Sequence, residues 1–100
     1  MEVRIKKEDN ATVAYLDGRL DTAVSGEVTA ALAPLYEAAG EEIIVDCTDM
    51  SYISSSGLRI FLSLRKEAAA KGGKVIVRNL SDGVRQVFMM TGFLNLFEVR

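Results

Sequence analysis

Three consecutive serines, at positions 54 to 56, stand directly before Gly57 and the start of an apolar run. Hydroxyls in such a place could act as nucleophiles, cap a helix or receive a phosphate. Hydrolysis by a Ser-His-Asp triad is excluded, because the chain of 100 residues contains no histidine. A hydrolase elbow also needs a glycine two residues before its serine, where Ser54 precedes Ser56. One serine as a helix cap, with the others as polar loop residues, is the simplest interpretation, and a phosphate acceptor is the alternative.

The residue types give little support for metal or cofactor chemistry. Without histidine, only carboxylates and the single Cys47 remain as metal ligands, and they do not cluster at metal-ligand spacing. The segment "KGGK" at 71–74 lacks the spaced first glycine and the Ser or Thr of a phosphate-binding loop. We therefore predict no catalytic residue, no metal and no cofactor.

Charge and hydropathy narrow the range of partners. The chain has 12 Lys and Arg against 14 Asp and Glu, interspersed, so it offers no basic stripe for nucleic acid. No apolar run approaches the roughly 20 residues of a membrane span, and the N-terminus lacks the apolar region of a signal peptide. Cys47 cannot form an internal disulfide, so the cytoplasm is the expected location.

Five segments have the patterns of β-strands. Apolar and charged residues alternate at 2–6, and "ATVAYL" at 11–16 follows the turn "KEDN", so the two are predicted to form an antiparallel hairpin. Consecutive apolar residues at 43–45 and 75–77 predict strands buried on both faces, as in a parallel sheet. "LNLFEV" at 94–99 alternates and predicts a last short strand.

Three segments have helical spacing, with apolar residues recurring every three or four positions along 24–35, 57–68 and 84–91. Asp21 or Thr22 is the expected cap of the first helix, and Pro34 is expected to kink that helix or to end it early. A loop, "TDMSYIS", precedes the second helix, and Ser81 is the expected cap of the third.

The resulting order, β-β-α-β-α-β-α-β, predicts a single α/β domain over residues 1–100, with a mixed, mostly parallel sheet, an N-terminal hairpin and three helices. The three serines then follow a buried strand, at the sheet edge where open α/β proteins usually bind ligands and partners. Backbone N–H groups at the start of the second helix carry partial positive charge, which favours a phosphate there.

Two apolar pairs leave alternatives open. Leu58 and Leu62 flank the core face of the second helix, so they either pack at the edge of the core or form an apolar strip that a partner covers, with Arg59 and Arg65 at its rim. Of Met89 and Met90, we expect one to fill the core and the other to lie on a contact surface.

Taken together, the motifs resemble a STAS domain of the anti-sigma factor antagonist type, over essentially all 100 residues. The resemblance rests on four segments in order: "GRLD" at 18–21, "IIVDCTDMSYISSSGL" at 43–58, "GGKVIV" at 72–77 and "VFMMTGF" at 87–93. It implies a binding module that docks on an anti-sigma factor serine kinase. It further implies that the kinase phosphorylates the serine directly before the glycine, which is Ser56 here. It also implies that the phosphorylated form is released and that a phosphatase acting on phosphoserine resets the cycle.

The same resemblance implies a docking surface around the serines, with Asp21 in the turn after the second strand as part of it. We expect this surface to consist of Asp21, Ser54, Ser55, Ser56, Gly57, Leu58, Arg59 and Leu62. Ser54 stands where family members commonly have aspartate. A role without a phosphorylation cycle, as the STAS accessory subunit of a lipid-transport ABC complex or as a stressosome component, is the alternative.

Overall fold

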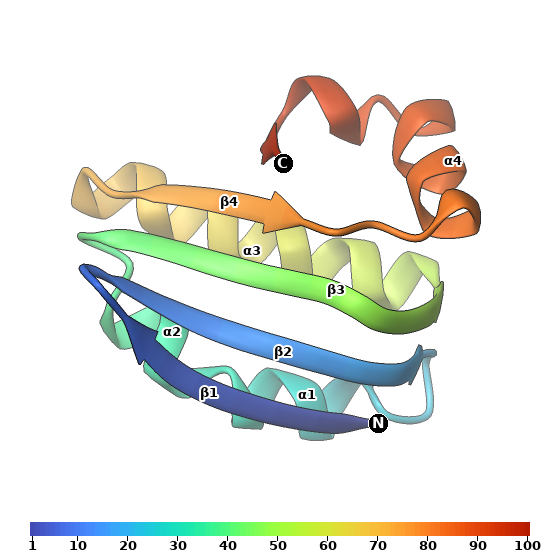
Figure 1. Ribbon diagram of the computed structural model, residues 1–100, viewed down its shortest axis with the longest axis horizontal. Coiled ribbons are helices and arrows are strands. Elements are labelled where there is room, and N and C mark those ends of the chain that lie inside the picture. The colour runs from blue at the N-terminus through green and yellow to red at the C-terminus, as the bar shows by residue number, and fades with distance from the viewer.

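A five-stranded sheet in the order β1-β2-β3-β4-β5 forms the centre of the computed structural model, which describes all of residues 1–100 (Figure 1). Its strands are β1 (Glu2–Glu8), β2 (Ala11–Leu20), β3 (Glu42–Ile53), β4 (Lys74–Arg78) and β5 (Glu98–Val99). β1 runs antiparallel to β2, and the remaining neighbours are parallel. The predicted N-terminal hairpin and mostly parallel sheet are therefore confirmed.

The helices are α1 (Ser25–Ala31), α2 (Ala33–Glu37), α3 (Ser55–Lys71) and α4 (Asp82–Met90), followed by a 3-10 turn, η1 (Phe93–Asn95). Figure 1 shows α1, α2 and α3 together behind the sheet, and α4 beyond the end of β4. Pro34 lies at the start of α2, where its missing N–H costs no hydrogen bond. The first predicted helix is thus two helices, and the chain has four α-helices instead of three.

Apolar side chains from the strands and helices form one core of 22 buried residues between the sheet and the helix layer. All four phenylalanines of the chain meet in it. The rings of Phe61 on α3 and Phe88 on α4 lie 5.5 Å apart at 85°, and Phe93 lies 5.5 Å from Phe88. Such edge-to-face pairs contribute about 0.5 to 1.5 kcal/mol each beyond burial, and they fix α4 against the first half of α3.

Four buried apolar residues form a small cluster on the opposite face of the sheet, which carries no helix. They are Ala11, Val13, Ile44 and Ile76, and Tyr15 packs against them. Three cationic groups lie 5.6 to 5.8 Å from the centre of the Tyr15 ring, those of Arg4, Lys6 and Arg78. Long polar side chains therefore shield this apolar patch from water.

One prediction about the strands was wrong, and a second was correct only in part. Residues 48–53 belong to β3 instead of a loop, because β3 goes on pairing with β2 through two shifts of register. The shifts bury Met50 and Ile53, three residues apart, which hides the two-residue period of a strand. Near the C-terminus, only Glu98–Val99 is a strand, since Phe93 and Phe97 reach the core through a helical turn four residues apart.

The prediction that one methionine of α4 fills the core was also wrong. Met89 and Met90 are 62% and 76% exposed. Val84 and Phe88, four residues apart, supply the buried face of α4, which leaves both methionines on the side turned to solvent.

Candidate functional site

The C-terminal ends of two parallel strands bring Asp21 and the serines together. Leu20 and Ile53, the last residues of β2 and β3, are paired in the sheet. The backbone N–H of Ser54 donates to the carbonyl of Leu20 at 2.9 Å, which extends the pairing by one step. Asp21 and Ser54, 33 positions apart in the sequence, therefore leave the sheet side by side.

Ser54 is the cap of α3. Its Oγ accepts a hydrogen bond from the backbone N–H of Gly57 at 3.2 Å, and its backbone is extended, as at most helix caps. Serine is among the best residues at a helix cap, so Ser54 secures the helix start without adding a negative charge. The simplest interpretation of the serines is thereby confirmed for Ser54.

Ser56 lies in the first turn of α3, half-buried, and its hydroxyl points across to the turn that leads from β2 into α1. Its Oγ is 3.2 Å from Oγ1 of Thr22, and either oxygen can be the donor. The sequence indicated Thr22 only as a possible helix cap, and no sequence signal pointed to this contact. Ser55 is exposed and makes no side-chain hydrogen bond.

The turn that carries Thr22 is fixed by hydrogen bonds on both sides. Oδ1 of Asp21 accepts from the backbone N–H of Val24 at 3.2 Å, and Oγ of Ser25 donates to the carbonyl of Thr22 at 3.0 Å. The prediction that Asp21 or Thr22 caps the first helix was wrong, because α1 begins at Ser25 with Val24 as its cap and without a side-chain capping bond. Asp21 instead fixes the turn before the helix. The two hydroxyls that meet are held by structured backbone on both sides.

Gly57 is the point at which α3 approaches the sheet most closely. It is buried, and a Cβ at this position would lie 2.7 Å from Cγ of Leu20 and 2.8 Å from Cγ1 of Ile53. Side chains on the last residues of β2 and β3 therefore leave room only for glycine. This close approach places the first turn of α3, and Ser56 with it, against the two strand ends.

The three other residues expected on the docking surface differ in exposure. Leu58 is half-buried and packs against the main core, whereas Leu62 is 39% exposed and Arg59 is exposed without an ion pair. The core-edge alternative therefore fits Leu58, and the apolar-strip alternative fits Leu62. Tyr52, which the sequence did not single out, is 40% exposed near the end of β3 and is covered by the guanidinium of Arg19 at 4.2 Å.

A second polar cluster lies on the face of the sheet that carries no helix. Asp46 is only 4% exposed, and its Oδ2 accepts from Nε of Arg78 at 2.7 Å and from Nδ2 of Asn79 at 3.1 Å. Its Oδ1 accepts from the backbone N–H and the hydroxyl of Thr48. Burial alone would raise the pKa of Asp46, but these hydrogen bonds outweigh it and hold the pKa below its usual value.

The remaining titratable groups of note are structural. Burial raises the pKa of the Cys47 thiol, which keeps it protonated and agrees with a packing role. Tyr15 donates to Glu8, and this bond lowers the pKa of Glu8 and raises that of Tyr15. No three cysteine or carboxylate side chains converge closely enough to hold a metal ion.

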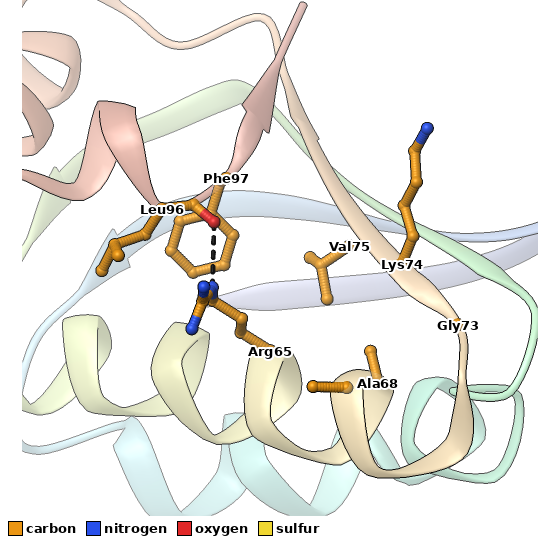
Figure 2. A pocket seen from close by; sticks show the side chains of 8 residues that line it. Arg65, Ala68, Gly73, Lys74, Val75, Leu96 and Phe97 are labelled. Atoms are coloured by element: carbon orange, nitrogen blue, oxygen red, sulfur yellow. Dashed lines mark hydrogen bonds between the residues drawn. The ribbon is translucent and has the colours of Figure 1, made fainter.

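Two surface hollows lie away from the serines. One, of about 220 Å³, sits between the C-terminal half of α3, the start of β4 and the segment Leu96–Phe97, with Arg65 donating to the carbonyl of Leu96 at 2.9 Å (Figure 2). The other, of about 360 Å³, is lined by Arg78, Arg100 and the turn after β1. None of the three serines lines either hollow.

Comparison with known proteins agrees with the resemblance found in the sequence. The family model described as STAS domain matches residues 2–100, and the chain belongs to the STAS domain family. Its similarity within that family is to the anti-sigma factor antagonists. The chain is 31% identical to BtrV of Bordetella bronchiseptica, which is described as an anti-sigma factor antagonist. The alignment of 99 residues covers 99% of this chain and 85% of BtrV.

The chain is also similar to a second curated protein and shares its fold with a solved structure. The anti-sigma-B factor antagonist of Bacillus subtilis is 26% identical over 99% of this chain and 90% of its own length. The solved structure of the Bacillus cell fate determinant SpoIIAA in the phosphorylated form has a TM-score of 0.74, with 24% identity over 99% of this chain and 91% of that chain. The resemblance read from the motifs is confirmed, and no helix of the chain is both long and apolar enough to cross a membrane.

Proposed function

We propose that this protein binds an anti-sigma factor that is also a serine kinase, and that phosphorylation of Ser56 ends the binding. A phosphatase acting on phosphoserine restores the binding form. The docking surface comprises Asp21, the three serines and the exposed part of α3 up to Leu62, and the encounter takes place in the cytoplasm.

The position of Ser56 is the observation that carries the proposal. Its hydroxyl lies at the protein surface, directly before the glycine that presses α3 onto the strand ends. Ser55 is more exposed but is not fixed by a side-chain contact, and Ser54 is occupied as the cap. The names of the relatives support an anti-sigma factor as the partner, and SpoIIAA, solved in a phosphorylated form, shares the fold.

Electrostatics explains how one phosphate could release a protein partner. The group adds about −1.5 to −2 charges at neutral pH. The first turn of α3 contains no acidic residue, and its N–H groups favour an anion, so the free protein tolerates the phosphate. A partner packed flat over Ser56 would have to bury that charge beside Asp21 and would lose binding.

The test is a comparison of two substitutions at the same residue. Ser56→Ala removes the acceptor hydroxyl and adds no charge, so we expect binding to the kinase within about threefold of wild type, whereas Ser56→Asp should weaken binding by at least about tenfold. Asn95→Asp adds the same charge at an exposed position on η1 and serves as the control for net charge. Equal binding by both Ser56 variants, measured by isothermal titration calorimetry, would contradict the proposal.

Intact mass after incubation with ATP and the kinase gives an independent measurement. Wild type should gain a single phosphate, and Ser56→Ala should gain none. A wild-type protein that stays unmodified and instead co-purifies with a transport ATPase would favour the accessory-subunit role and count against this proposal.

A further inference from the structure

The hydroxyl of Thr22 has Ser56 as its only hydrogen-bond partner. Oγ1 of Thr22 lies 3.2 Å from Oγ of Ser56 and makes no other side-chain hydrogen bond. The other two hydroxyls of this region are already committed, because Ser25 donates to the carbonyl of Thr22 at 3.0 Å and Thr29 donates to the carbonyl of Ser25 at 2.9 Å. The hydroxyl hydrogen of Thr22 is therefore available to an acceptor at position 56.

We propose that Thr22 is a positioning residue of the switch, donating to the oxygen of Ser56 before phosphorylation and to a phosphate oxygen afterwards. This inference rests on the proposed phosphorylation of Ser56. In that transfer, Oγ of Ser56 forms a bond to the γ-phosphorus of ATP, the bond to ADP breaks, and the hydroxyl proton of Ser56 passes to the kinase. The phosphoserine is then held against the turn between β2 and α1 and does not swing freely into solvent.

The geometry allows Thr22 to donate to a phosphate oxygen on Ser56 without movement of the backbone. A phosphate oxygen is two bonds from Oγ of Ser56, within reach of a hydroxyl that lies 3.2 Å from that same atom. The hydroxyl of threonine needs only to rotate, because Asp21 and Ser25 fix the turn around it. A bond to a charged acceptor is about twice as strong as one to a neutral oxygen, so the phosphate strengthens a contact that already exists.

The pKa of the second ionisation of the phosphate depends on the hydrogen bond from Thr22 and can be measured. A donor that favours the dianion lowers the second pKa of phosphoserine, which is ordinarily about 6. The measurement is a ³¹P NMR titration of protein carrying phosphoserine incorporated at position 56 during translation, so no kinase is needed. Asp21, next to Thr22 in the chain, and Arg59, three residues after Ser56, carry charges, and both residues are unchanged in every protein compared.

Three variants complete the experiment. Thr22→Val removes the donor and should raise the phosphoserine pKa by about 0.5 unit, whereas Thr22→Ser should retain the wild-type value. Thr29→Val makes the same substitution at an exposed threonine of α1 that does not contact Ser56, and it should also titrate like wild type. A melting curve for each phosphorylated variant ensures that the titration is recorded on folded protein.

Two failures can be told apart. If Thr22→Val titrates together with wild type, or if Thr29→Val shifts as much as Thr22→Val, Thr22 is not the donor and the inference is overturned. If the phosphorylated protein binds the kinase as tightly as the unmodified protein, the proposed function fails, whatever the titration shows.

Discussion

Gly57 offers the sharpest test of how the serine segment is positioned, through the substitution Gly57→Ala. The added Cβ would fall 2.7 Å from Leu20 and 2.8 Å from Ile53, about 0.6 to 0.7 Å short of the 3.4 Å at which ordinary contact begins. Both neighbours are at most 4% exposed, so neither has free space into which it can turn. The helix start and the strand ends must therefore separate.

The expected magnitude combines two opposing effects. Forcing a methyl group into a well-packed core costs about 1 to 3 kcal/mol, whereas alanine in place of glycine favours a helix by up to about 1 kcal/mol. We expect a net loss of about 1 to 2 kcal/mol in the free energy of unfolding. For a domain of this size that loss corresponds to a fall in Tm of about 5 to 10 °C.

The assay is thermal unfolding followed by circular dichroism, with Gly83→Ala as the matched control. Gly83 lies in the first turn of α4, and a Cβ there meets nothing within 4 Å, so that variant should melt at or slightly above the wild-type temperature. Equal melting of Gly57→Ala and wild type, or equal shifts in both variants, would refute the claim that α3 is pressed onto Leu20 and Ile53. Because Ser56 adjoins Gly57, we also expect Gly57→Ala to weaken partner binding.

Two further predictions concern the cap and the buried carboxylate. Ser54→Ala should lower the free energy of unfolding by about 1 kcal/mol, because the N–H of Gly57 loses its acceptor, and Ser55→Ala should leave it nearly unchanged; urea unfolding checks both. Asp46→Asn should cost about 2 to 3 kcal/mol at pH 7, since the charge-assisted bond from Arg78 is lost. The lowered pKa of Asp46 means that its ionised form stabilises the protein above the unfolded pKa of about 3.9, and this contribution is lost as the pH falls through the folded pKa. The difference in the free energy of unfolding between wild type and Asp46→Asn should therefore narrow below about pH 4. A difference that stays constant from pH 7 to pH 3 would contradict this assignment.

The parts of the fold that were predicted correctly depend on residues close together in the sequence. The apolar runs at 43–45 and 75–77 mark buried strands, Pro34 marks the break in the first helical segment, and Ser81 caps α4 by accepting from the N–H of Val84. Each of these patterns involves only a few consecutive residues. Local backbone preferences and side-chain periodicity are sufficient there.

The wrong predictions have a common cause. Residues 48–53 lack a two-residue period because the sheet shifts register, and a register shift is a property of two strands together. Both Met89 and Met90 are exposed because α4 turns the face of Val84 and Phe88 to the core, where Phe88 packs against Phe61 of α3. Neither effect can be read from the segment in which it occurs.

The sequence by itself determined the α/β class, the order of strands and helices, and the location of three hydroxyls at the start of a helix after a buried strand. Only the tertiary structure decided that Thr22 meets Ser56, that Gly57 leaves no space for a side chain, and that Asp46 pairs with Arg78. The physical reason is that the contacts of Thr22 with Ser56, of Asp46 with Arg78 and of Gly57 with Leu20 each join residues 32 or more positions apart. The distances between these residues depend on strand register and on the close approach of α3 to the sheet. Neither can be predicted from a local pattern of residues.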